Sequence, residues 1–174
     1  MISKFFYQVA NLKKVQRSGW KSKLKLLDSE SVADHTYMMS VMAMVLSDIK
    51  NLNTEKIIKM SMLHDWAESK IGDFMPGEVT NDEKNNLEEK AMTEIISNLP
   101  DKLENNYLDI WNDYRDQISL ESKFVHQLDK LEMVLQAKIY EDDVGYDKIK
   151  PFLISALDEI VDDDLKKIVS EIIQ

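Results

Sequence analysis

Apolar residues recur at helical spacing along this chain, and this pattern constrains the fold more than any other feature. Residues 3–17, 101–116 and 119–140 each carry apolar side chains three or four positions apart. No segment alternates convincingly between apolar and polar residues, as a half-buried strand would. The sequence has only four Gly and three Pro, so few sites suit tight hairpin turns. We therefore predict an all-α fold.

One domain is the expected organisation. The chain has 174 residues, of which 44% are hydrophobic, so it is long enough for a real core and too apolar for a disordered segment. No internal repeat or low-complexity linker divides it. We expect residues 1–174 to form a single domain.

Capping residues predict where the helices begin. Ser31 to Asp34 fits a capping box, Asn53 or Thr54 starts the next helix, and Ser119 starts a long one. Gly19 is a plausible end of the first helix. The expected helices cover residues 3–17, 31–51, 54–72, 81–98, 101–116, 119–140, 147–160 and 162–173, with loops at 18–30 and 73–77.

Composition excludes several classes of function. The absence of Cys rules out disulfides, thiolate metal sites and Cys nucleophiles. Any metal must therefore be held by Asp, Glu or one of three His. A net charge of −10 argues against a nucleic acid polymer as partner. A small anion held by a metal is still compatible, because the ion sets the local field.

Neither a signal peptide nor a membrane span is expected. Residues 1–14 lack the continuous apolar core and the small-residue cleavage site of a signal peptide. The longest apolar run, Met38–Leu46, is interrupted by Ser40 and is too short to cross a bilayer. We expect a cytoplasmic protein with no membrane partner.

The stretch Met60–Phe74 is where we expect the chemistry. It places His64, Asp65 and Glu68 within five residues. In a helix, His64 and Glu68 lie one turn apart on a face that is otherwise apolar. Burying an imidazole and a carboxylate together is costly unless they are paired, hydrogen-bonded or bound to a metal.

Two further candidates lie on other predicted helices. His35 falls in the first turn of its helix and shares a face with methionines that are expected to be flexible core filler. Asp129 lies beside an apolar stripe, between Val125 and Met133. Together with His64 and Asp65, these two residues form a ligand set that suits a divalent transition metal. Spacing alone leaves open whether the histidines are ligands or structural core residues.

The order His, His-Asp, Asp resembles the HD superfamily of metal-dependent phosphohydrolases. The wider match resembles one branch, the HD-domain 5′-deoxynucleotidases, which include the YfbR-like enzymes and their eukaryotic relatives. The resemblance covers about residues 5–145, and the C-terminal helices near 147–173 do not contribute to it. It rests on the segments RSGW (17–20), ESVADH (30–35), HDWAE (64–68), IGD (71–73) and VHQLD (125–129).

This resemblance implies a single HD-domain helical bundle, usually a homodimer, that hydrolyses deoxyribonucleoside 5′-monophosphates to deoxynucleoside and phosphate. One divalent metal (Mn, Co, Fe, Zn or Ni) would be held by His35, His64, Asp65 and Asp129. Such a metal lowers the pKa of bound water and offsets phosphate charge.

The same resemblance implies roles for four more residues. Glu68 would orient or deprotonate the attacking water, and Asp73 would bind the sugar side or assist the leaving oxygen. Arg17 would meet the phosphate through its planar fork, and Trp20 would help shape the sugar pocket. Read without the family, Asp73 is a loop cap and Arg17 is a helix-end cation favoured by the dipole.

Two features depart from the family pattern. Ser18 and Gly19 separate Arg17 from Trp20, whereas the two are adjacent in YfbR-like enzymes and spaced in the eukaryotic relatives. His126 stands where relatives tend to carry Lys. It lies one turn before Asp129, so it is expected at the phosphate or behind the ligands, and not among them.

Two other functions compete with this reading. Alarmone hydrolases resemble His-Asp-x-x-Glu-Asp at the second motif, and this chain has Ser69 in place of the second acid. The other alternative is a non-catalytic helical binding module with a vestigial metal site. The presence of all four ligand positions argues against it.

Overall fold

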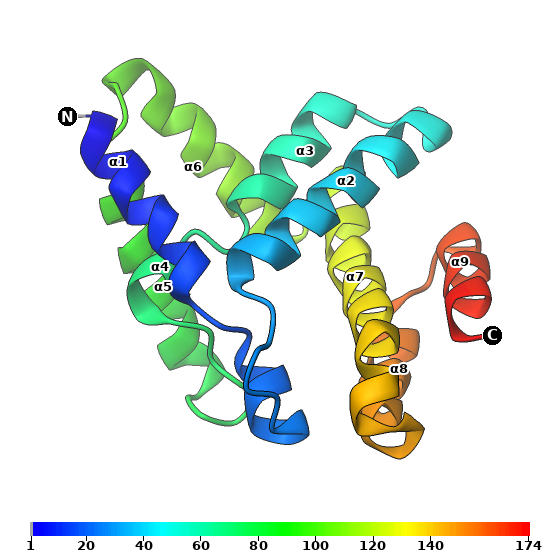
Figure 1. The fold of residues 1–174 in the computed structure, drawn as a ribbon. Helices are drawn as coiled ribbons and strands as arrows, with labels where there is room; N and C mark the ends of the chain where they lie inside the picture. The colour runs from blue at the N-terminus through cyan, green and yellow to red at the C-terminus, as the bar shows by residue number, and fades with distance from the viewer. Residues whose placement is uncertain (1) are drawn as a thin grey trace.

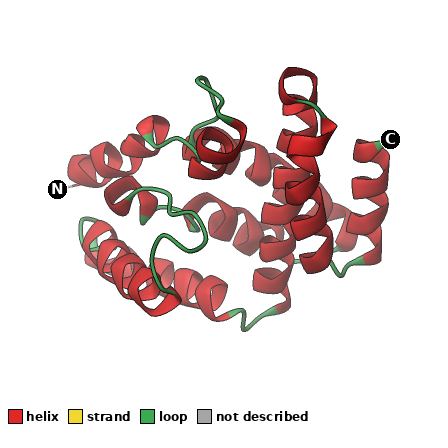
Figure 2. Ribbon diagram, turned by 90° about the horizontal axis from the view of Figure 1, so that it is seen from below, coloured by secondary structure: helices red, strands yellow, loops and turns green. Residues whose placement is uncertain are grey.

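The fold, described for residues 2–174 by a computed structural model, is built from helices (Figure 1). The α-helices are α1 (Ile2–Val9), α2 (Val32–Lys50), α3 (Thr54–Leu63), α4 (Glu68–Ile71), α5 (Asn81–Ile96), α6 (Asp101–Asp116), α7 (Leu120–Val144), α8 (Tyr146–Glu159) and α9 (Asp163–Ile173). Figure 2 shows helices and loops but no strand in this part of the chain. The prediction of an all-α fold is confirmed.

The long helix α7 is central to the packing. It contacts α2, α3, α6, α8 and α9, and Figure 1 shows it running through the middle of the right half of the molecule. Its apolar stripe is buried as expected at Phe124, Leu128 and Leu131. Because Asp129 lies beside this stripe, the packing of α7 brings a carboxylate to the inside of the bundle.

The predicted capping residues form the N-caps of α2, α3 and α7. The backbone N–H of Asp34 donates to Ser31 Oγ, while the Asp34 carboxylate accepts from the Ser31 N–H, which forms the predicted capping box. Asn53, and not Thr54, caps α3 through its side-chain oxygen. Ser119 caps α7, which ends at Val144 and so runs about one turn past the expected end.

The helix expected over residues 3–17 ends early. After α1, a 3-10 helix (η1, Ala10–Lys14) follows, and Val15 is extended, with φ −86° and ψ 110°. Backbone pairing replaces helix at this point: the Val32 N–H donates to the Val15 carbonyl at 2.8 Å, and the Arg17 N–H donates to the Glu30 carbonyl at 3.1 Å. The prediction is therefore wrong beyond Lys14, and Arg17 precedes the next helical segment instead of closing the first helix.

The segment expected to be a loop over residues 18–30 contains a turn of π-helix (η2, Trp20–Leu24). Gly19 has helical angles, φ −59° and ψ −45°, so its predicted role as a helix stop is wrong. The turn buries Trp20 and Leu24, and burial of these side chains accounts for the order of a segment whose sequence lacks a long apolar pattern.

The helix expected over residues 54–72 is interrupted. α3 ends at Leu63, and α4 begins at Glu68. Between them the backbone hydrogen bonds join residues three positions apart instead of four. The Trp66 N–H donates to the Leu63 carbonyl, and the Glu68 N–H donates to the Asp65 carbonyl. The expected end near Gly72 is confirmed, but the continuous helix is not.

The remaining helices lie close to their predicted bounds.

Across the residues that the structure describes, no helix combines the length and the apolar character needed to cross a membrane.

Candidate active site

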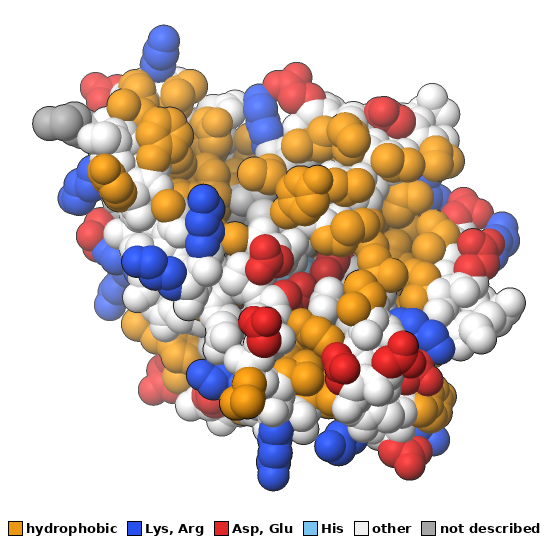
Figure 3. Space-filling model, viewed as in Figure 1, with side chains coloured by type: hydrophobic (Ala, Val, Ile, Leu, Met, Phe, Trp, Pro, Cys, Tyr) orange, Lys and Arg blue, Asp and Glu red, His pale blue; other side chains and the backbone are white. Residues whose placement is uncertain are grey.

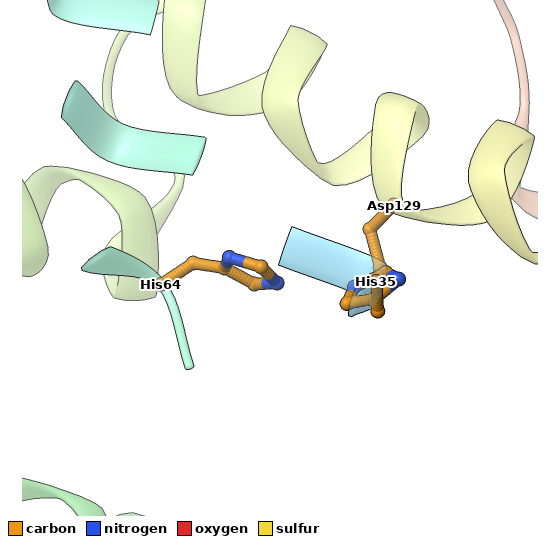
Figure 4. Close-up of side chains that lie close together, drawn as sticks. All are labelled: His35, His64 and Asp129. Carbon is orange, nitrogen blue, oxygen red and sulfur yellow. The ribbon is translucent and has the colours of Figure 1, made fainter. Parts of the chain in front are cut away.

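Two histidines and an aspartate from three different helices converge in the interior. Figure 4 shows the side chains of His35 (α2), His64 (at the end of α3) and Asp129 (α7) directed toward a common point. One ligand atom from each lies within 4.8 Å of the others. His35 Nε2 is 3.2 Å from Asp129 Oδ1. The sequence prediction placed these three residues at one site, and the structure brings them together.

Asp65 completes the predicted set of four. Its Oδ2 atom lies 3.0 Å from His64 Nε2 and 3.8 Å from His35 Nε2. Burial alone would raise the pKa of Asp65. The nearby His64, His35 and Arg17 guanidinium outweigh this effect and lower the pKa from 3.8 to about 2. The tightened turn after α3 is the local structure that presents His64 and Asp65 to the same point.

The outer nitrogen of each histidine ring is held by the protein. His35 Nδ1 lies 2.6 Å from Glu132 Oε2, and His64 Nδ1 lies 2.7 Å from the Ser61 carbonyl oxygen. A carbonyl oxygen can only accept, so the proton of neutral His64 is on Nδ1. Partners of this kind leave Nε2 as a lone-pair donor toward the interior, which is the arrangement of metal-binding histidines.

Three buried atoms at the point of convergence form no hydrogen bond within the described residues: His35 Nε2, His64 Nε2 and Asp65 Oδ2. They lie close to one another and to Asp129, but these short distances lack the geometry of a hydrogen bond. Unsatisfied buried polar atoms are costly, and their clustering needs an explanation. A divalent cation bound by imidazole and carboxylate satisfies all three atoms at once. The residues present therefore fit a metal ion.

Electrostatics at this point are strongly coupled. Burial and the Arg17 charge lower the pKa of His35, but the carboxylates of Asp129 and Glu132 outweigh them and raise it to about 9. Burial opposes ionisation of Asp129, yet His35, Lys130 and Arg17 hold its pKa well below the usual range. Asp65 and Asp129 thus stay charged at neutral pH, as carboxylate ligands must, whereas His35 must release a proton from Nε2 when it binds a metal.

Arg17 sits against the ligand carboxylates. Its Nη1 atom is 3.9 Å from Asp65 Oδ2, and its Nη2 atom is 3.9 Å from Asp129 Oδ1. On its inner side, Nε lies 3.9 Å from Glu30 Oε1. The backbone pairing of Arg17 with Glu30 places the guanidinium here, so a fork of donors faces the same space as the ligand atoms.

Glu68 is buried, and its Oε2 atom has no hydrogen-bond partner among residues 2–174. Burial, followed by the negative charges of Asp65 and Asp73, raises its pKa well above the usual value. A carboxylate with these properties in a cleft is a candidate proton acceptor near neutral pH.

Asp73 and Trp20 both have structural partners. The Ser18 N–H donates to Asp73 Oδ2 at 2.7 Å, so Asp73 fixes the segment that follows Arg17. The Trp20 indole N–H donates to Glu30 Oε1 at 2.7 Å. The Trp20 ring packs against Phe152 of α8, with centroids 4.4 Å apart.

A cavity of about 490 Å³ opens onto these groups. Arg17, His64, Asp65, Glu68 and Asp129 line its floor, and further residues of α5, α6 and α8 form its walls. Asp73 and Trp20 also border it. The volume falls in the range of small-molecule sites, about 300–1,000 Å³.

His126 borders the cavity without joining the ligands. Its Nε2 atom lies 2.8 Å from the Tyr114 carbonyl oxygen, and its ring stacks on the Tyr114 ring, with centroids 4.2 Å apart and planes at 4°. The structure thus places His126 at the cavity, against Tyr114 of α6 and one turn before Asp129.

Sequence reasoning missed Glu132, Glu30 and Tyr114. Glu132 lies one turn after Asp129 within an otherwise apolar stretch, and this is a signal that could have identified it. Glu30 lies in the loop directly before the capping box of α2, and its position depends on backbone pairing with Arg17, which no local pattern predicts. Tyr114 falls within the predicted helix over residues 101–116, where helical spacing does not distinguish an aromatic site residue from a core residue.

Comparisons with known proteins agree with this geometry. A family model described as an HD domain matches residues 9–171. The 5′-deoxynucleotidase HDDC2 of Homo sapiens is 42% identical over 139 residues, which cover 79% of this chain and 67% of that protein. The 5′-deoxynucleotidase YGK1 of Saccharomyces cerevisiae is 34% identical over 169 residues, which cover 93% of this chain and 77% of that protein. A solved structure from Pyrococcus furiosus, called a conserved hypothetical protein, has a TM-score of 0.80 at 25% identity and covers 98% of both chains.

Proposed function

Because this chain belongs to the HD domain family, we propose that it is a metal-dependent 5′-deoxynucleotidase. It would hydrolyse deoxyribonucleoside 5′-monophosphates to deoxynucleoside and phosphate. Relatives that carry this activity in their names are 42% and 34% identical to this chain over most of its length. The proposal includes residues 1–174 as one HD domain.

One observation carries the proposal. Buried atoms of His35, His64 and Asp65 that form no hydrogen bond converge beside the Arg17 guanidinium. His64, Asp65 and Arg17 line one cavity, with His35 buried behind them, so candidate metal ligands and a phosphate-binding fork face the same space, which suits a phosphate ester.

We propose His35, His64, Asp65 and Asp129 as the metal ligands. The imidazole and carboxylate donors favour Mn, Co, Fe, Zn or Ni. When bound, such an ion supplies Lewis acidity toward the phosphate and a lowered pKa for water.

The protein's own groups then divide the remaining work. Arg17 donates two parallel hydrogen bonds to phosphate oxygens and neutralises part of their charge. Glu68 accepts the proton of the attacking water, a role that its raised pKa suits. Asp73 holds the Arg17–Ser18 segment and borders the sugar side, while Trp20 shapes that side of the cavity.

We also propose a homodimer in the cytoplasm, as the sequence led us to expect. Apolar side chains are exposed along α2, at Tyr37, Met44, Val45 and Ile49, and on α3 at Met62. Figure 3 shows hydrophobic side chains gathered over this region of the surface. An apolar face of this kind is typical of an interface between subunits. Light scattering after size-exclusion chromatography, compared between the wild type and Val45→Glu, tests it.

A substrate panel tests the reaction. Phosphate release is measured from deoxyribonucleoside and ribonucleoside 5′-monophosphates and from guanosine tetraphosphate, after reconstitution with each of the five metals. Activity with deoxyribonucleoside monophosphates supports the proposal. A preference for guanosine tetraphosphate, or no hydrolysis with any metal, contradicts it. In the same assay Asp129→Asn, a change at a proposed ligand, should lose phosphate release, and Asp143→Asn, an exposed change on the same helix, is its matched control.

A further inference from the structure

Tyr114 of α6 lies at the wall of the cavity, beside the candidate ligands. Its ring meets the His64 ring edge to face, with centroids 5.6 Å apart and planes at 72°. The other contact is the parallel stack on His126. With its ring held from two directions, the phenol has little freedom to turn away from the cavity.

The surroundings of the phenol are acidic. Asp65, Glu88 and Asp129 line the same cavity as Tyr114. A tyrosine phenol, with an ordinary pKa of about 10, is an uncharged group among these carboxylates at neutral pH. An uncharged O–H can donate a hydrogen bond there without forming an ion pair with the ligand carboxylates, as Lys or Arg would.

His126 fixes this phenol from behind. The imidazole is hydrogen-bonded to the backbone carbonyl of Tyr114, and its plane is parallel to the Tyr114 ring. A single residue of α7 therefore sets both the backbone and the ring of a residue of α6. This gives a physical role to the histidine that sequence reasoning singled out but left unassigned.

We propose that Tyr114 donates a hydrogen bond from its hydroxyl to the phosphate group of the substrate, and that His126 is the residue that positions it. This inference rests on the proposed function, because it takes a phosphate monoester as the occupant of the cavity. The phosphate must lie near Arg17 and the ligand atoms of His64 and Asp65, and Tyr114 contacts that same His64.

Tyr114→Phe tests the contact, because it keeps the stacked ring and removes only the hydroxyl. Binding of inorganic phosphate to the metal-loaded protein is measured by calorimetry, together with metal content and melting temperature. A hydrogen bond to a charged group has a typical strength that predicts a loss of about tenfold to a hundredfold in phosphate affinity. The metal content and the melting temperature should not change. Tyr107→Phe is the matched control, since Tyr107 lies on the same helix but stacks on Trp66.

Binding of a deoxynucleoside, which lacks phosphate, separates this proposal from its rival. Unchanged deoxynucleoside affinity is expected. If Tyr114→Phe weakens deoxynucleoside binding and spares phosphate, the hydroxyl faces the sugar or the base, and the proposal is wrong. Unaltered binding of both probes also overturns it. If the wild type binds phosphate with Tyr114 dependence but hydrolyses no monophosphate, the proposed function fails and this contact stands.

A double-mutant cycle tests the positioning role of His126. As a single change, His126→Ala should weaken phosphate binding. In the Tyr114→Phe background it should cause little further loss of phosphate affinity, because the hydroxyl that His126 positions is then absent. Additive losses would show that His126 acts independently of Tyr114.

Discussion

Glu132 Oε2 lies 2.6 Å from His35 Nδ1, on the side of the imidazole ring opposite the candidate metal site. Both side chains are almost fully buried, with exposed fractions of 1% for Glu132 and 0% for His35. The contact joins α7 to α2 and sets the direction in which His35 Nε2 points. A carboxylate behind a ligating histidine also raises the basicity of that ligand.

Replacing Glu132 should therefore weaken metal binding without removing a ligand. For Glu132→Gln we expect metal affinity to fall by about 10- to 100-fold, the usual cost of losing such a partner. Competition with a chelator of known affinity measures it. Asp143→Asn, exposed on the same helix, should leave the affinity unchanged. Equal affinities for Glu132→Gln and the wild type would show that this contact serves only the fold.

Glu68→Gln should keep the metal and the fold but lose turnover. Gln has the same shape as Glu but cannot accept the proton of the attacking water, so kcat should fall by about 10²–10⁴-fold. The KM should change little, because the phosphate still meets Arg17. Metal content, melting temperature and steady-state kinetics are measured on one preparation. If the variant loses its metal, Glu68 is a ligand. If kcat is nearly normal, the base lies elsewhere, with Asp73 as the next candidate.

The features that sequence reasoning predicted are those set by local chemistry. The capping box of Ser31 and Asp34 needs only four consecutive residues, and the stripe of α7 needs only helical periodicity. The candidate ligands came from residue type, spacing and the family pattern.

The features that it missed depend on contacts between distant segments. Arg17 leaves the helical path because its backbone pairs with Glu30, thirteen positions further along the chain. The break between Leu63 and Glu68 puts two adjacent side chains, His64 and Asp65, at one point, although the local pattern favours an unbroken helix. Tertiary packing determines where these helices end, and no local sequence pattern predicts it.

Arg17→Ala should weaken substrate binding far more than metal binding. Loss of the guanidinium removes the donors for phosphate but none of the candidate ligands. We expect KM to rise about tenfold or more, and Arg17→Lys to recover only part of this, because a single ammonium cannot make two parallel hydrogen bonds. Lys102→Ala, an exposed cation of α6, is the control for loss of positive charge. An unchanged KM in Arg17→Ala would exclude a phosphate contact.

Asp113 connects three helices, and its loss should destabilise the protein at neutral pH. Asp113 of α6 accepts from Lys56 Nζ of α3 at 2.6 Å and from the Ser119 N–H and hydroxyl at the start of α7, at 2.9 and 2.8 Å. For Asp113→Ala we expect a loss of about 1–3 kcal/mol in the free energy of unfolding, the usual cost of leaving charge-assisted partners unmet. Urea denaturation at pH 7 measures it.

The pH dependence of that loss gives a second test. Burial raises the pKa of Asp113, but the bonds from Lys56 and Ser119 outweigh it and lower the pKa from 3.8 to about 2 in the folded protein. A depressed folded-state pKa means that the stabilisation is fully present above pH 3.8 and is lost as the pH falls toward 2. The difference between the wild type and Asp113→Ala should therefore be constant from pH 7 to about pH 5 and shrink below it. A difference that stays constant down to pH 2 would mean that the side chain stabilises the fold through packing and not through its charge.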